Sequence, residues 1–432
     1  MFRNKIVKNA SWIIACRIVQ SIFGLVITML TARYLGPSNY GSINYAASIV
    51  AFFLPIMQLG LPNILVQEAI QHPDEEGKTL GSALLMSCCS SIACIVGVVA
   101  FASVANEGNT ETIIVCGLYS TLLLFQAFEL MQYWYQAKYL SKYVAAVSMC
   151  AYILVALYKA FLLVTKKNIY WFAVSHAVDY FLIAIALLVI YFRLGGQPLT
   201  FSRQIVKRLW SSSKYYIVSS LMVTVFAQTD KIMLTIMVDE TATGYYSAAV
   251  SCAGVTSFVF AAIIDSARPA IFGSKTHSVD LFERNLSNLY CIVIYLSLAQ
   301  CLCTTILAKP IILLLYGIDY STAIPALQLI VWYTTFSYLG TIRDIWILAE
   351  EKQRFLWRIN LSGALANVCL NALLIPLWGV MGAAFASLVT QIFTNVIIGF
   401  VIKPIARNNL LMIQGLSPQY ALSAIRKVLS KK

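Results

Sequence analysis

Charged side chains interrupt a run of apolar residues at positions 225–237, which reads VFAQTDKIMLTIM. Asp230 and Lys231 lie in the middle of this run, and a charge inside an apolar segment is costly unless it is paired or functional. At 100° per residue, Lys231 shares a helix face with Ser220 and Thr224, whereas Asp230 lies on the flank of that face. The pattern indicates either a cation presented to a cavity or an ion pair that locks helices together.

Other polar and ionisable residues recur at similar depth within apolar segments. The candidates for a substrate cavity are Arg17, Lys159, Lys231, Arg343, Gln58 and Asn44, and the candidates for ion coupling or structural pairing are Glu129, His176, Asp179, Asp230 and Asp344. Four cations suit an anion such as a phosphate or pyrophosphate group. The acids at similar depth leave open that some of these cations are fully paired inside the protein.

The composition defines the class of protein that must position these side chains. Of the 432 residues, 60% are hydrophobic and 11% are charged, whereas about 25% are charged in a soluble domain. The apolar residues form long segments without the short alternating pattern of a membrane β-barrel. The composition therefore predicts an all-α integral membrane protein. The net charge of +13 does not form one basic face, so it does not indicate nucleic-acid binding.

About twelve apolar segments are long enough to cross a bilayer. Their approximate limits are 10–33, 43–66, 79–104, 112–136, 144–165, 169–192, 214–238, 243–268, 286–308, 322–348, 357–377 and 379–402. With the N-terminus inside, the outer connections hold only Arg33, Lys166, Lys167 and Lys309, and the inner ones hold the other Lys and Arg residues outside the spans. This bias predicts a multi-pass membrane protein with both termini in the cytoplasm.

The longest inner connection divides the chain into two halves of six spans each. We expect an N-terminal lobe at 1–192, a cytoplasmic amphipathic linker at 193–213, a C-terminal lobe at 214–403 and a basic cytoplasmic tail at 404–432. A short internal repeat supports the two halves, because YGSINYAAS at 40–48 aligns with TGYYSAAVS at 243–251 when Gly41 is placed on Gly244. Two such halves around a central cavity are a known transporter plan.

The sequence lacks the motifs of the common soluble active sites. It has no G-x-S-x-G and no H-E-x-x-H, the cysteines make no metal-ligand spacing with histidine, and Gly77-Lys78-Thr79 is not preceded by the glycine of a phosphate-binding loop. No outer connection is large enough to hold a catalytic domain. We therefore expect a transporter, with no cofactor, no metal and no enzymatic activity, although an enzyme buried in the membrane stays an alternative.

Several motifs resemble those of the Wzx-type oligosaccharide flippases of the multidrug/oligosaccharidyl-lipid/polysaccharide exporter superfamily. They are A-R-Y-L-G-P at 32–37, Y-G at 40–41, L-G-L at 59–61, T-D-K-I-M-L at 229–234 and L-Y-G at 315–317. The resemblance implies two six-helix lobes around a positively charged cavity, to which Arg17, Lys159, Lys231 and Arg343 would contribute. It also implies transfer of an undecaprenyl-pyrophosphate-linked oligosaccharide repeat unit from the inner to the outer leaflet of a bacterial plasma (inner) membrane, for O-antigen or capsule synthesis.

The expected function is therefore a flippase that works by alternating access. Its partners would be the lipid-linked oligosaccharide, membrane lipids, and the polymerase and chain-length machinery of the same pathway. The alternatives within the superfamily are a cation-coupled drug antiporter and a lipid II flippase. The alternative from another class is a membrane-embedded glycan polymerase or ligase.

Overall fold

A computed structural model of the chain describes residues 2–106 and 108–417, with side chains from Gly24 onward apart from that of Ser219. Over these ranges the chain forms helices joined by short turns, and it contains no strand. The prediction of an all-α membrane protein is confirmed. The chain divides into two compact units, Met1–Gly244 and Tyr245–Lys432, which we call unit 1 and unit 2.

Unit 1 begins with a helix that is too long to be one membrane span. Helix α1 runs from Phe2 to Met57 and is interrupted by the non-helical backbone of Gly36, with φ 74° and ψ 171°. Its 56 residues would extend about 84 Å if straight, whereas the hydrocarbon core of a bilayer measures about 30 Å. Positive φ favours glycine, and Pro37 suits the first turn of the helix that follows. Gly36 therefore separates α1 into two arms, which correspond to the first two predicted spans.

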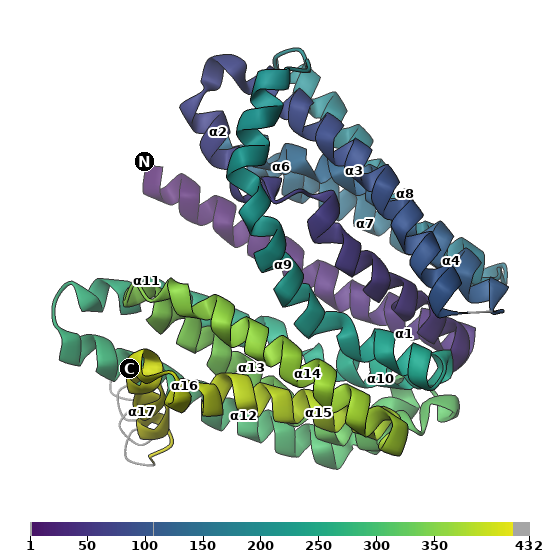
Figure 1. The fold of residues 1–432 in the computed structure, drawn as a ribbon, viewed down its shortest axis with the longest axis vertical. Helices are drawn as coiled ribbons and strands as arrows, with labels where there is room; N and C mark the ends of the chain where they lie inside the picture. The colour runs from purple at the N-terminus through teal and green to yellow at the C-terminus, as the bar shows by residue number, and fades with distance from the viewer. Residues whose placement is uncertain (1, 107, 418–432) are drawn as a thin grey trace. The chain divides into compact units, whose positions relative to one another are not determined.

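The remaining helices of unit 1 pack around these two arms. They are η1 (Leu61–Asn63), α2 (Leu65–Gln71), η2 (Pro73–Glu75), α3 (Glu76–Ala105), α4 (Thr110–Ser120), α5 (Leu122–Gln126), η3 (Ala127–Leu130), α6 (Met131–Ala137), α7 (Ser141–Val164), α8 (Ile169–Arg193) and α9 (Arg203–Met237). Helix α4 contacts α1, α3 and α8, α7 lies along α8, and α9 packs against α1 and α3 (Figure 1). These contacts bring the predicted polar residues of α5 to α8 into one region.

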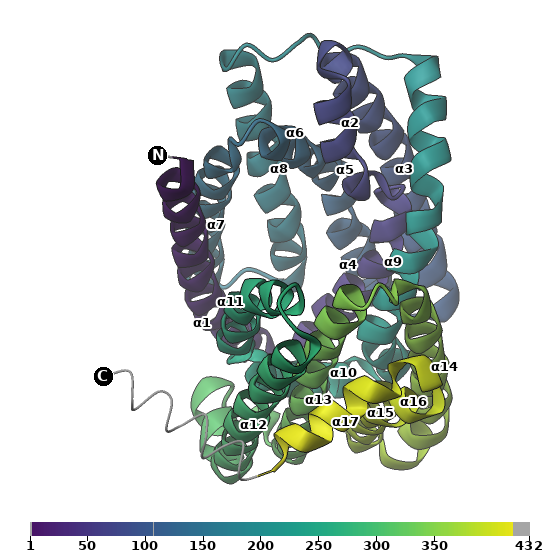
Figure 2. The same cartoon turned by 90° about the vertical axis from the view of Figure 1, so that its left-hand side faces the viewer.

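Unit 2 is a second helical bundle. Helix α10 (Glu240–Gly254) begins at the end of unit 1 and leads to α11 (Ser257–Lys275), α12 (Val279–Leu315), η4 (Ile318–Tyr320), α13 (Ala323–Ala349), η5 (Gln353–Phe355), α14 (Leu356–Trp378), α15 (Val380–Ile392), the π-helix η6 (Phe393–Ile397), α16 (Ile398–Val401), η7 (Lys403–Ile405) and α17 (Ala406–Gly415). Helix α12 packs on α13, α14 on α15, and α17 on α12 (Figure 2). The hydrophobic core of unit 2 lies between α11, α12, α13 and the segment from α16 to α17.

Every predicted span falls on helical structure, but the count of twelve is not established. Among the described residues, nine helices are long and apolar enough to cross a membrane, or ten if the pair α10 and α11, bent by 43°, forms one span. Two physical features account for the difference. Helix α1 counts as one although Gly36 divides it into two arms, and α13, which contains polar residues such as Gln328 and Arg343, is not among the nine. The count of twelve stays a prediction.

The linker expected at 193–213 is in part continuous with the membrane span that follows it. Helix α9 begins at Arg203 and runs unbroken to Met237, so the amphipathic segment and the seventh predicted span form one helix. Ile205 and Leu209 are buried in a core cluster of unit 1. Unit 1 therefore extends to Gly244 and includes α9. The proposed lobe limits at 192, 213 and 403 remain predictions, and residues 418–432 of the tail lie outside the described part of the chain.

Candidate functional site

A cluster of ionisable side chains occupies the interior of unit 1. Lys159 on α7 lies with its Nζ 3.4 Å from Nε2 of His176 on α8. Asp179, one turn after His176, interacts electrostatically with Lys159. One oxygen of the Asp179 carboxylate is buried and accepts no hydrogen bond from any described residue. The packing of α7 along α8 thus brings three of the predicted site residues together.

A second acid lies beside this cluster. Gln126 on α5 donates through its Nε2 to Glu129 Oε2 at 3.3 Å and to the hydroxyl of Tyr180 at 3.2 Å. Glu129 and Asp179 also interact electrostatically with each other. Two acids therefore accompany one lysine, so this region does not favour an anion. It fits structural pairing or the binding of a proton or cation, the two roles that the sequence left open for Glu129, His176 and Asp179.

The pair that interrupts the apolar run lies in the second half of α9. Asp230 is buried and Lys231 is partly buried, and Asp230 interacts electrostatically with Lys231. The backbone carbonyl of Lys231 accepts a hydrogen bond of 3.2 Å from the Thr243 hydroxyl, which ties α9 to the start of α10. The Lys231 ammonium itself donates no hydrogen bond to any residue that the structure describes. Its three donors are therefore available to an anionic ligand.

Arg343 is held by several partners inside unit 2. It is 5% exposed, and it donates to Asp344 Oδ1 at 2.9 and 3.2 Å, to the Thr394 carbonyl at 2.8 Å and to Asn395 Oδ1 at 3.0 Å. Thr394 and Asn395 belong to the π-helix η6, a geometry that is often found at functional sites. Asn395 donates in turn to Gln391. In this structure Arg343 joins α13 to the last span, which is the role of a fully paired cation.

The remaining predicted cavity residues are distributed along α1. Asn44 donates through its Nδ2 to the Tyr40 carbonyl of its own helix at 2.9 Å. Gln58 is partly buried at the turn that ends α1. The side chain of Arg17 lies outside the described residues. The sequence did not single out Gln228, which accepts a hydrogen bond of 3.1 Å from Ser48 and so links α9 to α1 about one turn before Lys231.

Gly41 and Gly244, the two glycines of the internal repeat, lie where two helices come into close backbone contact. A Cβ placed on Gly41 would lie 2.7 Å from the carbonyl carbon of Glu240 and closer still to its oxygen. A Cβ placed on Gly244 would lie 2.8 Å from the carbonyl carbon of Pro37, again closer to the oxygen. Gly41 comes four residues after Pro37, and Gly244 comes four residues after Glu240. Each glycine therefore meets the carbonyl that lies one helical turn before the other glycine, so the contact is reciprocal. The second arm of α1 and the start of α10 cross here with their backbones in contact, which the repeat alone did not reveal.

Comparison with known proteins agrees with this architecture. A family model described as "Polysaccharide biosynthesis protein" matches residues 6–275. No curated protein sequence matches the chain significantly.

Solved membrane transporters have a similar fold. A structure titled "Lipid II flippase MurJ, inward closed conformation" has a TM-score of 0.72 at 14% identity and covers 97% of this chain and 92% of that one. An inward-facing multidrug resistance transporter of the MATE family, in the MOP superfamily, has a TM-score of 0.66 at 12% identity and covers 91% of this chain and 95% of that one. At these identities the likeness establishes the shared fold.

Proposed function

Because the chain belongs to the polysaccharide biosynthesis protein family, we propose that it is a flippase for a lipid-linked oligosaccharide. The substrate of this proposal is an undecaprenyl-pyrophosphate-linked repeat unit, which moves from the inner to the outer leaflet of a bacterial plasma membrane by alternating access. The repeat unit would then supply O-antigen or capsular polysaccharide synthesis. The polymerase and chain-length machinery that consume the product are the expected partners.

The observation that carries the proposal is the Lys231 ammonium. It lies on a membrane-spanning helix and has no hydrogen-bond acceptor among the described residues, whereas Lys159 and Arg343 each have polar partners in the protein. A cation without an acceptor is costly in an apolar segment, and a ligand oxygen would offset that cost. A pyrophosphate supplies several anionic oxygens. We therefore assign the binding of the substrate's pyrophosphate to Lys231, with Asp230 orienting the ammonium.

The alternatives make different demands on the same residues. A cation-coupled drug antiporter would prefer cationic substrates, which the Lys231 ammonium repels. A lipid II flippase would carry the same pyrophosphate, so only the attached glycan separates it from our proposal. A membrane-embedded polymerase or ligase would lengthen the glycan and would need a catalytic group beside the pyrophosphate. The cluster of Lys159, Asp179 and Glu129 is our candidate for coupling transport to a proton or another cation.

Deletion of the gene in its host tests the proposal. We expect complete lipid-linked repeat units to accumulate with the sugar facing the cytoplasm, and the surface polymer to disappear. The orientation can be measured in spheroplasts by adding a membrane-impermeant reagent that modifies the sugar. Single repeat units that reach the outer leaflet without being polymerised would instead support the polymerase or ligase and contradict the flippase.

A further inference from the structure

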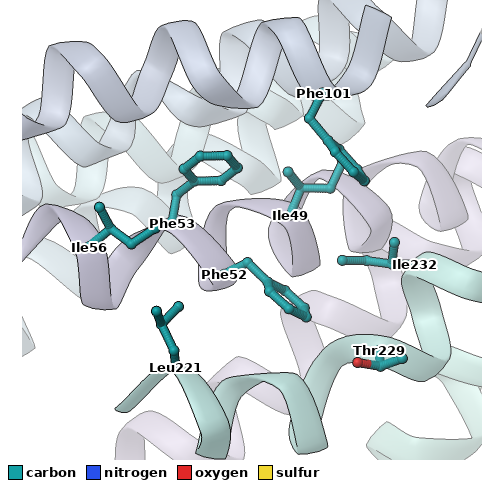
Figure 3. Close-up of a pocket in the computed structure, with 8 residues that line it drawn as sticks. All are labelled: Ile49, Phe52, Phe53, Ile56, Phe101, Leu221, Thr229 and Ile232. Atoms are coloured by element: carbon teal, nitrogen blue, oxygen red, sulfur yellow. The ribbon is translucent and has the colours of Figure 1, made fainter. Parts of the chain in front are cut away.

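An apolar groove runs along α9 in unit 1, on a face next to Lys231. It has a volume of about 320 Å³, which is at the lower end of the range of about 300–1,000 Å³ for small-molecule pockets. Helices α1, α3 and α9 form its walls (Figure 3). The lining residues are Ile49, Phe52, Phe53, Ile56, Phe101, Leu221, Thr229 and Ile232.

The lining offers no free polar group to a ligand. Seven of the eight residues are hydrophobic, and the hydroxyl of the eighth, Thr229, donates to the Val225 carbonyl of its own helix at 2.6 Å. A cavity of this kind does not favour water, since water needs two to four polar partners. The occupant that fits the groove is therefore a hydrocarbon group.

The position of the groove determines where such a group comes from. The three helices that line it belong to segments that are long and apolar enough to cross the membrane. Two of the lining residues, Ile56 and Phe101, are partly exposed on the surface of unit 1. A hydrocarbon chain can therefore enter from the lipid phase, from the side of the bundle.

A polar region adjoins one end of the groove. Leu221 and Ile232 lie about 16 Å apart along α9, and Lys231 directly precedes Ile232 at this end of the groove. The hydrogen bond between Ser48 and Gln228 lies on the same side of α9 as Lys231. The side chain of Lys231 points about 100° around the helix axis from that of Ile232, so its ammonium lies beside the groove and not within it. The order of an apolar channel followed by a cation matches a long hydrocarbon chain that ends in an anionic head group.

We infer that this groove holds the first part of the polyprenyl chain of the substrate while Lys231 binds the pyrophosphate. The inference rests on the proposed function, because a polyprenyl pyrophosphate is the amphiphile that this function requires. It assigns a site to the lipid part of the substrate, which would otherwise remain in the bilayer. Phe52, Phe53 and Phe101 would contact the chain from two helices, and Leu221 would contact it from the third.

Photo-crosslinking of the full-length protein tests this inference. The protein is placed in nanodiscs of phosphatidylethanolamine and phosphatidylglycerol with a polyprenyl pyrophosphate that carries a diazirine in its first isoprene units. We expect the modified peptides to contain the lining residues of α1 and α9, and an excess of undecaprenyl pyrophosphate to reduce the labelling at least fivefold. A phosphatidylglycerol with a diazirine in its acyl chain serves as the control probe.

Two variants on the same helix sharpen the test. Leu221→Trp fills the groove and should reduce labelling at least fivefold, whereas Val223→Trp lies on the opposite, exposed face of α9 and should leave it unchanged. Equal labelling of the groove by the phosphatidylglycerol probe, or labelling that Leu221→Trp does not reduce, would overturn the inference. Labelling of the groove in a protein that moves no lipid-linked sugar would support the inference and contradict the proposed function.

Discussion

Substitution of Gly41 by alanine should destabilise the protein by an amount that the helix crossing determines. The new methyl group would lie 2.7 Å from the carbonyl carbon of Glu240 and 2.8 Å from the Gly244 nitrogen, and real Cβ atoms essentially never come closer than 3.0 Å to other heavy atoms. Both neighbours are backbone atoms, so no side chain can rotate away. The second arm of α1 and the start of α10 must therefore separate.

The expected cost follows from two opposing terms. Overpacking of a close-packed contact costs about 1–3 kcal/mol, and alanine gains about 0.8–1.0 kcal/mol over glycine as a helix former. Because the clash involves backbone on both sides, we expect overpacking near the upper end and a net loss of about 2 kcal/mol. Gly273→Ala in α11 is the matched control, because the space into which its new methyl group would point is open. It should stabilise the protein slightly.

Unfolding of the purified protein by titration with a denaturing detergent, followed by circular dichroism, measures both effects. Gly244→Ala should resemble Gly41→Ala, since it meets the Pro37 carbonyl in the same way. The double variant should lose less than the sum of the two single losses, because the first substitution already opens the shared crossing. A Gly41→Ala protein as stable as Gly273→Ala would refute the reasoning.

Three further predictions concern the ionisable residues. Lys231→Ala should lower the initial transport rate about tenfold or more at normal protein level, whereas Lys231→Arg should keep most of the rate. The rates are measured in proteoliposomes, with the exposed Lys166→Ala as the control. Full transport by Lys231→Ala would exclude the binding role. Arg343→Ala should lower the free energy of unfolding by about 2–4 kcal/mol, because the Thr394 carbonyl and Asn395 lose their donor; unchanged detergent unfolding would contradict this. Asp179→Asn should lower the amount of protein in the membrane because it leaves Lys159 without its acid. The double variant Asp179→Asn/Lys159→Met should restore that amount, as measured by quantitative immunoblotting of membranes. An amount that stays low in the double variant would count against the pairing.

The spans and the first helical break could be predicted from local sequence. A bilayer requires about twenty consecutive apolar residues per helix, so every predicted span coincides with helical structure. Gly36 followed by Pro37 also marks a break, because glycine allows positive φ and proline begins a new helix. These features depend on a few neighbouring residues, which the sequence shows directly.

The contacts between helices could be predicted only in part. Helical periodicity placed His176 and Asp179 on one face of their helix, but it could not show that Lys159 of the preceding helix meets that face. The repeat identified Gly41 and Gly244 as equivalent, but not that their backbones cross. The partners of Arg343 depend on the π-helix at Phe393–Ile397, whose extra residue in one turn leaves no mark in the hydropathy pattern.

The most direct test of the central claim is a flipping measurement with the purified protein. Proteoliposomes are prepared with an undecaprenyl-pyrophosphate-linked oligosaccharide, and a membrane-impermeant oxidant added outside reports the fraction of sugar exposed over time. The account predicts that the initially protected half of the lipid becomes accessible when the wild-type protein is present, and stays protected in protein-free liposomes. With Lys231→Ala the same half should become accessible about tenfold more slowly. Continued protection with the well-folded wild-type protein, under imposed proton and sodium gradients of either direction, would contradict it.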